Sequence, residues 1–193
     1  MNLIDQIPLV ERRVVREGAG AGVELSRTYA ASGADLWDAL TDPARLEHWF
    51  EPVSGELAEG GRFHLAASGV SGTVSTCTAE ECLRLTWDDT GDLSTVEITL
   101  SPASPGTRLT LTHLGPADEH WETYGPAAGG IGWDSSLAAL EFHLAMETDS
   151  LEGEEETFIR DVALAWSQAS VDAGGDPAAA RAQADRTIEF YLG

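Results

Sequence analysis

Strict alternation of apolar and polar residues between positions 82 and 114 constrains the fold of this chain more than any other feature. In each of the segments 82–88, 95–101 and 107–114, every second residue is apolar, with Thr107 and His113 as the exceptions. In a β-strand this period of two places each set on its own face of the sheet. One face then carries Leu83, Leu85, Trp87, Val96, Ile98, Leu100, Leu109, Leu111 and His113. Threonine, arginine and glutamate dominate the opposite face, so water covers that face and an apolar element must cover the first.

A helix over residues 131–146 is the best candidate for the cover. Trp133, Leu137, Leu140 and Leu144 recur there at helical spacing. Period-two patterns between turn residues predict further short strands, over residues 10–16, 23–30, 53–57, 62–67 and 72–77. The glycine-rich residues 18–22 are expected to form a loop between the first two. These elements predict an α+β fold in which a curved antiparallel sheet wraps around a long C-terminal helix and encloses a cavity.

Two short helices are predicted between the second and third strands. Ser32 or Gly33 caps the first, over residues 34–41, whose apolar face carries Leu36, Trp37 and Leu40. Asp42-Pro43 ends it, because proline disfavours helical geometry at the preceding residue and favours the first position of a new helix. The second helix then covers residues 44–49 and leads into the aromatic pair Trp49-Phe50.

The composition changes after residue 148. An acidic connector at residues 152–156 leads into a helix over residues 155–170, and Asp176-Pro177 caps a last helix that ends near Gly193. The apolar faces of these two helices are too thin for an independent domain. We therefore predict one domain over residues 1–148 and a helical extension over residues 149–193 that packs on it, and a homodimer in which the extension contacts a second subunit remains open.

The charge balance excludes several classes of partner. The formal net charge is −22, from 33 acidic and 11 basic residues. Such a charge repels nucleic-acid backbones and anionic membrane surfaces. No apolar run approaches the about 18 residues needed to span a bilayer. We expect a cytoplasmic protein that binds neither nucleic acid nor membranes.

Two cysteines, Cys77 and Cys82, flank a four-residue segment that is typical of a hairpin turn. Cysteines that face each other on paired strands can form a disulfide, but only when their side-chain vectors point toward each other. Nothing else in the chain points to an oxidising compartment, which favours reduced thiols. Zinc is not expected, because no other cysteine or histidine lies at ligand spacing.

Several motifs resemble, in order, those of the START-like (SRPBCC) superfamily. They are Leu36-Trp37-Asp38-Ala39-Leu40-Thr41-Asp42-Pro43, Trp49-Phe50, Gly60-Gly61-Arg62-Phe63, Thr86-Trp87, Leu109-Thr110-Leu111-Thr112-His113 and Gly132-Trp133-Asp134. Within the superfamily, the chain is most similar to the branch named after the activator of heat-shock protein 90 ATPase. The resemblance covers roughly residues 10 to 147 and implies a helix-grip fold. It does not specify a function, because this fold supports many.

The resemblance also implies where a ligand binds. Members of the superfamily usually hold a hydrophobic molecule between the long C-terminal helix and the sheet. This placement predicts a ligand-binding set of Trp87, Ile98, Leu111, His113, Trp133, Leu137 and Leu140 in the cavity, and of Trp49, Phe50 and Phe63 at its mouth. Tyr124 and Arg62 are candidates for orienting a polar group of the ligand. An ordinary apolar core would require most of the same side chains.

His113 occupies a position where the strand pattern calls for an aliphatic residue. A buried imidazole there could orient a ligand or transfer protons near neutral pH, or it could be hydrogen-bonded for structural reasons alone. Asp118, Glu119 and His120 are adjacent in sequence, and such neighbours rarely converge on one metal ion. The chain shows no nucleophile motif. We expect no cofactor, no metal and no catalytic residues.

The leading functional hypothesis is binding or sequestration of a hydrophobic small molecule without catalysis. One form of it is antibiotic self-resistance, in which the glycine-rich residues 125–132 would be sacrificed to a reactive compound. A second hypothesis is a co-chaperone that activates a heat-shock ATPase in a stress response, with the chaperone as partner. The third is a polyketide cyclase or hydratase with His113 as acid or base.

Overall fold

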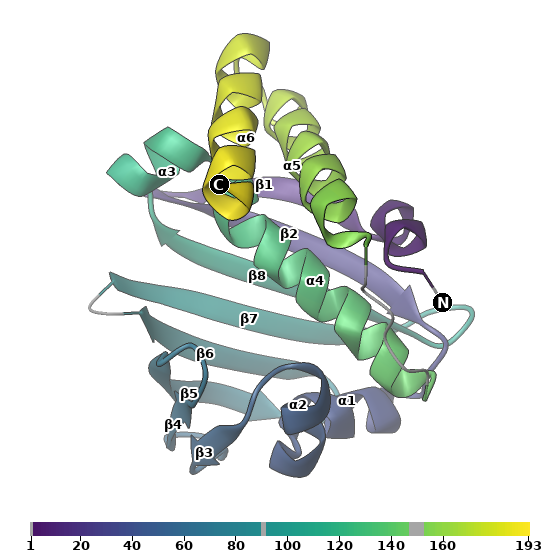
Figure 1. Ribbon diagram of the computed structural model, residues 1–193. Helices are drawn as coiled ribbons and strands as arrows, with labels where there is room; N and C mark the ends of the chain where they lie inside the picture. Colours follow the sequence, from purple (N-terminus) through teal and green to yellow (C-terminus); the bar gives the residue numbers. More distant parts are fainter. Residues whose placement is uncertain (1, 90–91, 147–152) are drawn as a thin grey trace.

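The eight strands pair in an antiparallel sheet with the order β1-β2-β8-β7-β6-β5-β4-β3, which curves around the long helix α4 (Figure 1). This computed structural model describes residues 2–89, 92–146 and 153–193. The strands are β1 (Glu11–Glu17), β2 (Gly20–Tyr29), β3 (Val53–Gly55), β4 (Arg62–Leu65), β5 (Ser71–Thr78), β6 (Cys82–Asp89), β7 (Asp92–Pro102) and β8 (Thr107–Pro116). The predicted α+β helix-grip architecture is confirmed.

Helices cover the concave face and one end of the sheet (Figure 1). They are the 3-10 helix η1 (Ile4–Leu9) and the α-helices α1 (Gly33–Thr41), α2 (Pro43–Trp49), α3 (Glu119–Tyr124), α4 (Ala127–Leu144), α5 (Glu155–Asp172) and α6 (Pro177–Leu192). Neither η1 nor α3 is predicted from the sequence, because six-residue elements are too short to show a helical period. No helix in the described part of the chain is both long and apolar enough to cross a membrane.

The alternation in β6, β7 and β8 orients the side chains as predicted. Val96 lies opposite His113, and Ile98 lies opposite Leu111, so that inward residues of neighbouring strands form rows across the sheet. The predicted loop at residues 18–22 is wrong in part, because β2 already begins at Gly20. Gly22 lies inside the strand, where a Cβ atom would come within 2.0 Å of the His113 carbonyl oxygen. Glycine is needed there for close backbone packing rather than for a turn.

Local capping determines where α1 and α2 begin. The Ser32 hydroxyl accepts a hydrogen bond from the Asp35 amide at 3.2 Å, and the Asp42 carboxylate accepts one from the Ala44 amide at 2.9 Å. Pro43 occupies the first turn of α2, where its missing amide costs nothing. Both helices therefore form where the sequence predicts them.

Helix α4 begins at Ala127, four residues earlier than predicted, and includes most of the glycine-rich segment. Glycine is a poor helix former, which is why the pattern placed the start at residue 131. Tertiary packing requires one of these glycines: a Cβ atom on Gly130 would lie 2.3 Å from the Trp166 indole nitrogen of α5. The sheet packs against one side of α4, and α5 packs against another side. Buried residues therefore extend around much of α4.

Asp134 of α4 is a buried anion with 2% of its surface exposed. The Arg12 guanidinium donates to both carboxylate oxygens, at 2.7 and 3.1 Å, and the Trp166 indole donates to one of them at 2.9 Å. Burial raises the pKa of the Asp134 carboxyl above its ordinary value. The charge of Arg12 and the hydrogen bonds from Arg12 and Trp166 lower this pKa, but by less than burial raises it. These contacts connect β1, α4 and α5.

The C-terminal helices pack on the rest of the chain. Helix α5 contacts α4, β1 and η1, and α6 contacts α5, α3 and α4 (Figure 1). Asp176 caps α6 as predicted, and the Thr187 hydroxyl in α6 donates to the Tyr124 carbonyl oxygen of α3 at 2.9 Å. The predicted boundary between residues 148 and 149 lies outside the described residues.

Both cysteines are free thiols. Cys77 in β5 lies opposite Leu83, whereas Cys82 in β6 lies opposite Thr78. Directly paired residues share a face of the sheet and neighbours along a strand do not. The two thiols therefore point to opposite faces.

Candidate ligand-binding site

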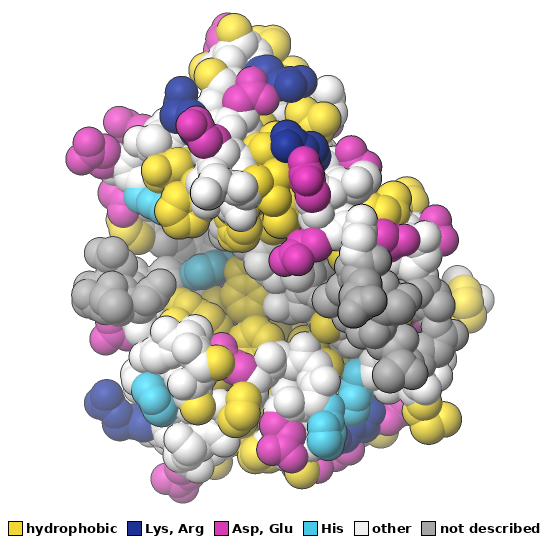
Figure 2. Space-filling view, viewed as in Figure 1, with side chains coloured by type: hydrophobic (Ala, Val, Ile, Leu, Met, Phe, Trp, Pro, Cys, Tyr) yellow, Lys and Arg dark blue, Asp and Glu magenta, His cyan; other side chains and the backbone are white. Residues whose placement is uncertain are grey.

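A cavity of about 90 Å³ lies between α4, α2 and the concave face of the sheet; we call it the central cavity. In Figure 2, a hollow with a hydrophobic floor opens on the same face of the molecule. Most of the predicted ligand-binding set lines the central cavity, namely Trp49, Phe50, Phe63, Trp87, Ile98, Leu111, Trp133 and Leu137. Helices α2 and α4 and strands β4, β6, β7 and β8, which are distant in sequence, thus bring these side chains together.

Three members of the predicted set do not line the central cavity. His113 lies beyond Trp87, with the two ring centroids 6.1 Å apart. Tyr124 belongs to α3, where its ring packs against Phe190 of α6 at 5.6 Å. Leu140 is fully buried elsewhere in the core. Arg62, the separate candidate for orienting a polar group, is exposed on β4. The alternation and helical spacing predict which face a residue occupies, but they do not predict its position along the cavity.

Several lining residues were missed by the sequence analysis. They include Leu46 of α2, Val53 of β3, Leu65 of β4 and Val74 of β5. Val53 and Leu65 lie opposite each other on the inner side of β3 and β4, so a period-two pattern could have identified them. Leu46 carried no such signal, because a seven-residue helix shows only two turns.

Aromatic rings form one wall of the central cavity. Phe50 stacks on Trp133 with ring centroids 6.3 Å apart and planes 8° apart, and Trp133 packs against Trp87 at 5.5 Å. Trp49 and Phe63 extend this cluster through Phe50 and Trp87 respectively. Aromatic pairs of this kind add about 0.5–1.5 kcal/mol beyond area burial, so the wall is held by mutual contacts.

His113 is fully hydrogen-bonded within the protein. The Trp133 indole, which can only donate, donates to Nδ1 of His113 at 3.0 Å. Nε2 must therefore carry the proton, and it donates to the Ser94 hydroxyl at 2.8 Å; that hydroxyl lies 3.2 Å from the Trp87 carbonyl oxygen, to which it donates. Burial lowers the pKa of His113 to about 4. The geometry is that of a neutral, structural histidine.

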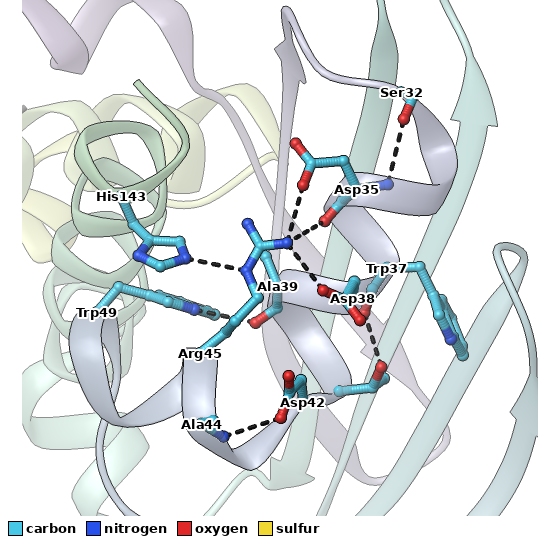
Figure 3. A network of polar contacts seen from close by, with 11 residues as sticks. Ser32, Asp35, Trp37, Asp38, Ala39, Asp42, Ala44, Arg45, Trp49 and His143 are labelled. Atoms are coloured by element: carbon cyan, nitrogen blue, oxygen red, sulfur yellow. Dashed lines mark hydrogen bonds and ion pairs between the residues drawn. The ribbon is translucent and has the colours of Figure 1, made fainter. Parts of the chain in front are cut away.

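Helix α2 is attached to the body by a polar network around Arg45 (Figure 3). The Arg45 guanidinium donates to Asp35 at 2.8 Å, to Asp38 at 3.1 Å and to Nε2 of His143 in α4 at 3.1 Å. The Trp49 indole donates to the Ala39 carbonyl oxygen at 3.0 Å. No residue of α2 is fully buried. The helix that carries Leu46 and Trp49 to the cavity is therefore held by partly buried apolar contacts together with this polar network.

Removing the Arg45 guanidinium is expected to loosen α2 without unfolding the protein. In Arg45→Met, amide hydrogen exchange at Leu46 and Phe50 should accelerate at least about fivefold, while global stability changes by less than about 1 kcal/mol because the network is partly exposed. Arg84→Met, which breaks an exposed pair with Glu97, is the matched control and should leave these amides unchanged. Unchanged exchange in Arg45→Met would show that other contacts hold α2.

In the described part of the chain, no three histidine, cysteine or acidic side chains are placed so that they could share a metal ion. Asp118 caps α3 by accepting from the Trp121 amide, and the His120 ring packs against Tyr124 at 4.9 Å, so these two side chains have separate partners.

Comparison with known proteins identifies relatives of this fold. CalU16 from Micromonospora echinospora is 28% identical in its crystal structure, with a TM-score of 0.67, and the match covers 83% of this chain and 94% of CalU16. Protein MLL2253 from Mesorhizobium loti is 29% identical, with a TM-score of 0.58 and coverage of 66% and 98%. DynU16, a protein in the dynemicin biosynthetic locus, is 22% identical with a TM-score of 0.59 over 67% of this chain and 48% of its own, which supports the fold alone.

The CalU16 match covers more residues than the segment 1–148 contains, so the similarity extends into the C-terminal helices. No curated protein matches the sequence. The sequence model of the family described as Activator of Hsp90 ATPase homolog 1-like protein matches residues 30–145, which is more than half of the chain. The chain therefore belongs to the Activator of Hsp90 ATPase homolog 1-like family, with the helix-grip architecture of the START-like superfamily.

Proposed function

We propose that this protein binds a hydrophobic small molecule in the central cavity and does not transform it. The observation that carries the proposal is the chemistry of the lining, in which Thr41 and Ser136 are the polar residues among many aliphatic and aromatic ones. Burial of apolar ligand surface contributes about 25 cal/mol per Å², so such a lining favours an apolar guest over water.

The size of the central cavity limits what enters without movement. Its volume of about 90 Å³ is smaller than the roughly 150 Å³ of a dry apolar cavity that holds benzene, and below the roughly 300–1,000 Å³ of typical ligand pockets. A larger ligand therefore has to widen the cavity. Helix α2 is the wall best suited to move, because partly exposed contacts of Arg45 hold it.

The hydrogen bonds of His113 favour binding over acid–base catalysis. A general base must have a nitrogen free to receive the substrate proton. Nδ1 of His113 already accepts from Trp133, and Nε2 already donates to Ser94. A cyclase or hydratase mechanism on His113 would first have to break the contact with Trp133.

Sacrifice of the glycine-rich segment is less favourable than simple sequestration. Residues 127–132 belong to α4, and Gly130 packs directly against Trp166. A reactive compound would need that part of the helix to unwind before it reached the backbone.

Activation of a heat-shock ATPase is the alternative that the family description supports. Such an activity would act through the surface rather than through the cavity. Purified protein added to an Hsp90 ATPase assay should raise turnover under this alternative, and an unchanged rate at saturating protein would exclude it.

Binding in the central cavity can be tested with N-phenyl-1-naphthylamine, a neutral probe whose fluorescence rises in apolar surroundings. Saturable binding with one site per chain is expected. Ile98→Phe places a larger side chain in the cavity and should weaken binding at least about tenfold. Leu100→Phe is the matched control, because Leu100 lies two residues further along the same face of β7 but does not line the cavity. Equal binding by both variants, or no saturable binding, would contradict the proposal.

A further inference from the structure

A second pocket of about 470 Å³ lies beside the central cavity, where the ends of β2, β7 and β8 meet α3 and the start of α4. Trp87 lines both spaces. Its ring packs against Trp133 on the side of the central cavity and against His113 on the side of the second pocket, with centroids 5.5 and 6.1 Å apart. The Trp133 ring also lies 5.7 Å from the His113 ring, so Trp87 and Trp133 together stand between an apolar cavity and a larger, more polar pocket.

The second pocket combines aromatic rings with a carboxylate. Trp87, Trp121 and His120 line it together with Asp118, whose side chain is exposed at the rim. Oδ1 of Asp118 accepts the Trp121 amide at 2.9 Å, which fixes the carboxylate at the start of α3. Aromatic faces and an anion together attract an ammonium group, through cation–π and Coulomb interactions.

The distribution of arginine and lysine disfavours a ligand that ends in an anionic group. Among the described residues that line either pocket there is no arginine, and the chain contains no lysine. The formal net charge of −22 adds a field that attracts cations and repels anions. A carboxylate or phosphate in the second pocket would find no positive partner there.

Gly129 leaves room on the α4 side of the second pocket. A Cβ atom on Gly129 would meet no atom within 4 Å, in contrast to Gly130, which is fixed by Trp166. Glycine inside a helix costs about 1 kcal/mol relative to alanine, and packing within the described residues does not account for that cost at Gly129. A side chain at this position would project into space that a ligand could fill.

We propose that the ligand is an elongated hydrophobic amine, with its apolar part in the central cavity and its ammonium group in the second pocket near Asp118. This inference rests on the proposed function, because it assigns the chemical class of the molecule bound there. Trp87 and Trp133 have to turn slightly to let the molecule pass, and Trp87 then contributes one of the rings around the cation.

Three probes of equal length test the class of ligand: octylammonium, octanol and octanoate, titrated by calorimetry at pH 7.5 and 0.15 M NaCl, where distant charges are screened. Octylammonium should bind at least tenfold more tightly than octanoate. Asp118→Asn keeps the helix cap and removes the charge, and should reduce that preference to threefold or less. Glu119→Gln, which removes a neighbouring charge outside the pocket, should leave it unchanged.

A second pair of variants tests the second pocket. Gly129→Leu fills it and should weaken octylammonium binding at least tenfold while leaving N-phenyl-1-naphthylamine unaffected. Gly132→Leu is the same change where a Cβ atom also meets open space but outside this pocket, and it should leave the preference for octylammonium over octanoate unchanged. Equal affinities for octylammonium and octanoate would overturn this inference, and so would unchanged octylammonium binding in Gly129→Leu. In either case, saturable binding of N-phenyl-1-naphthylamine would still support a ligand site in the central cavity. If the wild-type protein showed no saturable binding of N-phenyl-1-naphthylamine, the proposed function itself would be overturned.

Discussion

Replacing Asp134 by asparagine is expected to lower the free energy of unfolding by about 3–5 kcal/mol. Asparagine still accepts from the Trp166 indole, but it leaves the Arg12 guanidinium charged, 8% exposed and without an anion. Removing one partner of a buried ion pair is costly because the remaining charge keeps its desolvation penalty. The effect should be large because Asp134 connects β1, α4 and α5 at one point.

Denaturant unfolding of the wild type and the variant measures this loss. Asp185→Asn is the matched control, because Asp185 pairs with Arg181 on the exposed surface of α6, and it should cost less than about 1 kcal/mol. Arg12→Met added to Asp134→Asn should restore part of the stability by removing the unpaired charge. A loss below about 1 kcal/mol in the single variant, or no recovery in the double variant, would refute the proposed role of the ion pair.

Acidification should destabilise the protein through His113. The pKa of His113 is about 4 in the folded protein, against an ordinary value of 6.5 in the unfolded chain. Between these values the unfolded state binds more protons, so this contribution is complete above pH 6.5 and is lost as the pH falls toward 4. At about 1.4 kcal/mol per pKa unit, the expected loss is about 2 kcal/mol by pH 5 and about 3 kcal/mol by pH 4. Protonation of Nδ1 also breaks the hydrogen bond from Trp133.

The contribution of His113 is isolated by comparison with His113→Gln, whose amide can accept from Trp133 and donate to Ser94 but does not titrate. The free energy of unfolding is measured for both proteins between pH 7.5 and 5. Subtracting one set of values from the other cancels the contribution of the carboxyl groups, which both proteins share. The difference between wild type and variant should shrink by about 2 kcal/mol over this range. A constant difference would mean that His113 titrates near its ordinary pKa.

Patterns with a short period allowed the fold to be predicted from the sequence. The two-residue alternation in β6, β7 and β8 orients each side chain locally, because the pleat of a strand fixes it. The caps at Ser32, Asp42 and Asp176 likewise involve residues only two or three positions apart. Such signals do not depend on the rest of the molecule.

Contacts between distant segments explain what the sequence analysis missed. Asp134 resembles any polar residue on a helix until Arg12, 122 positions away, and Trp166, 32 positions away, surround it. Gly130 would argue against a helix if Trp166 did not require a residue without a Cβ atom. His113 is a candidate catalyst by residue type, and only the positions of Trp133 and Ser94 show that both of its nitrogens are engaged.

The amino-acid sequence by itself determined the sheet, the helix across it and the apolar character of the space between them, because periodicity and capping act over a few residues. Only the tertiary structure decided the size of the central cavity, the position of Trp87 on both this cavity and the second pocket, and the burial of Asp134. The volume between elements depends on how closely side chains from separate strands and helices interdigitate, and that packing is a property of the assembled fold rather than of any one segment.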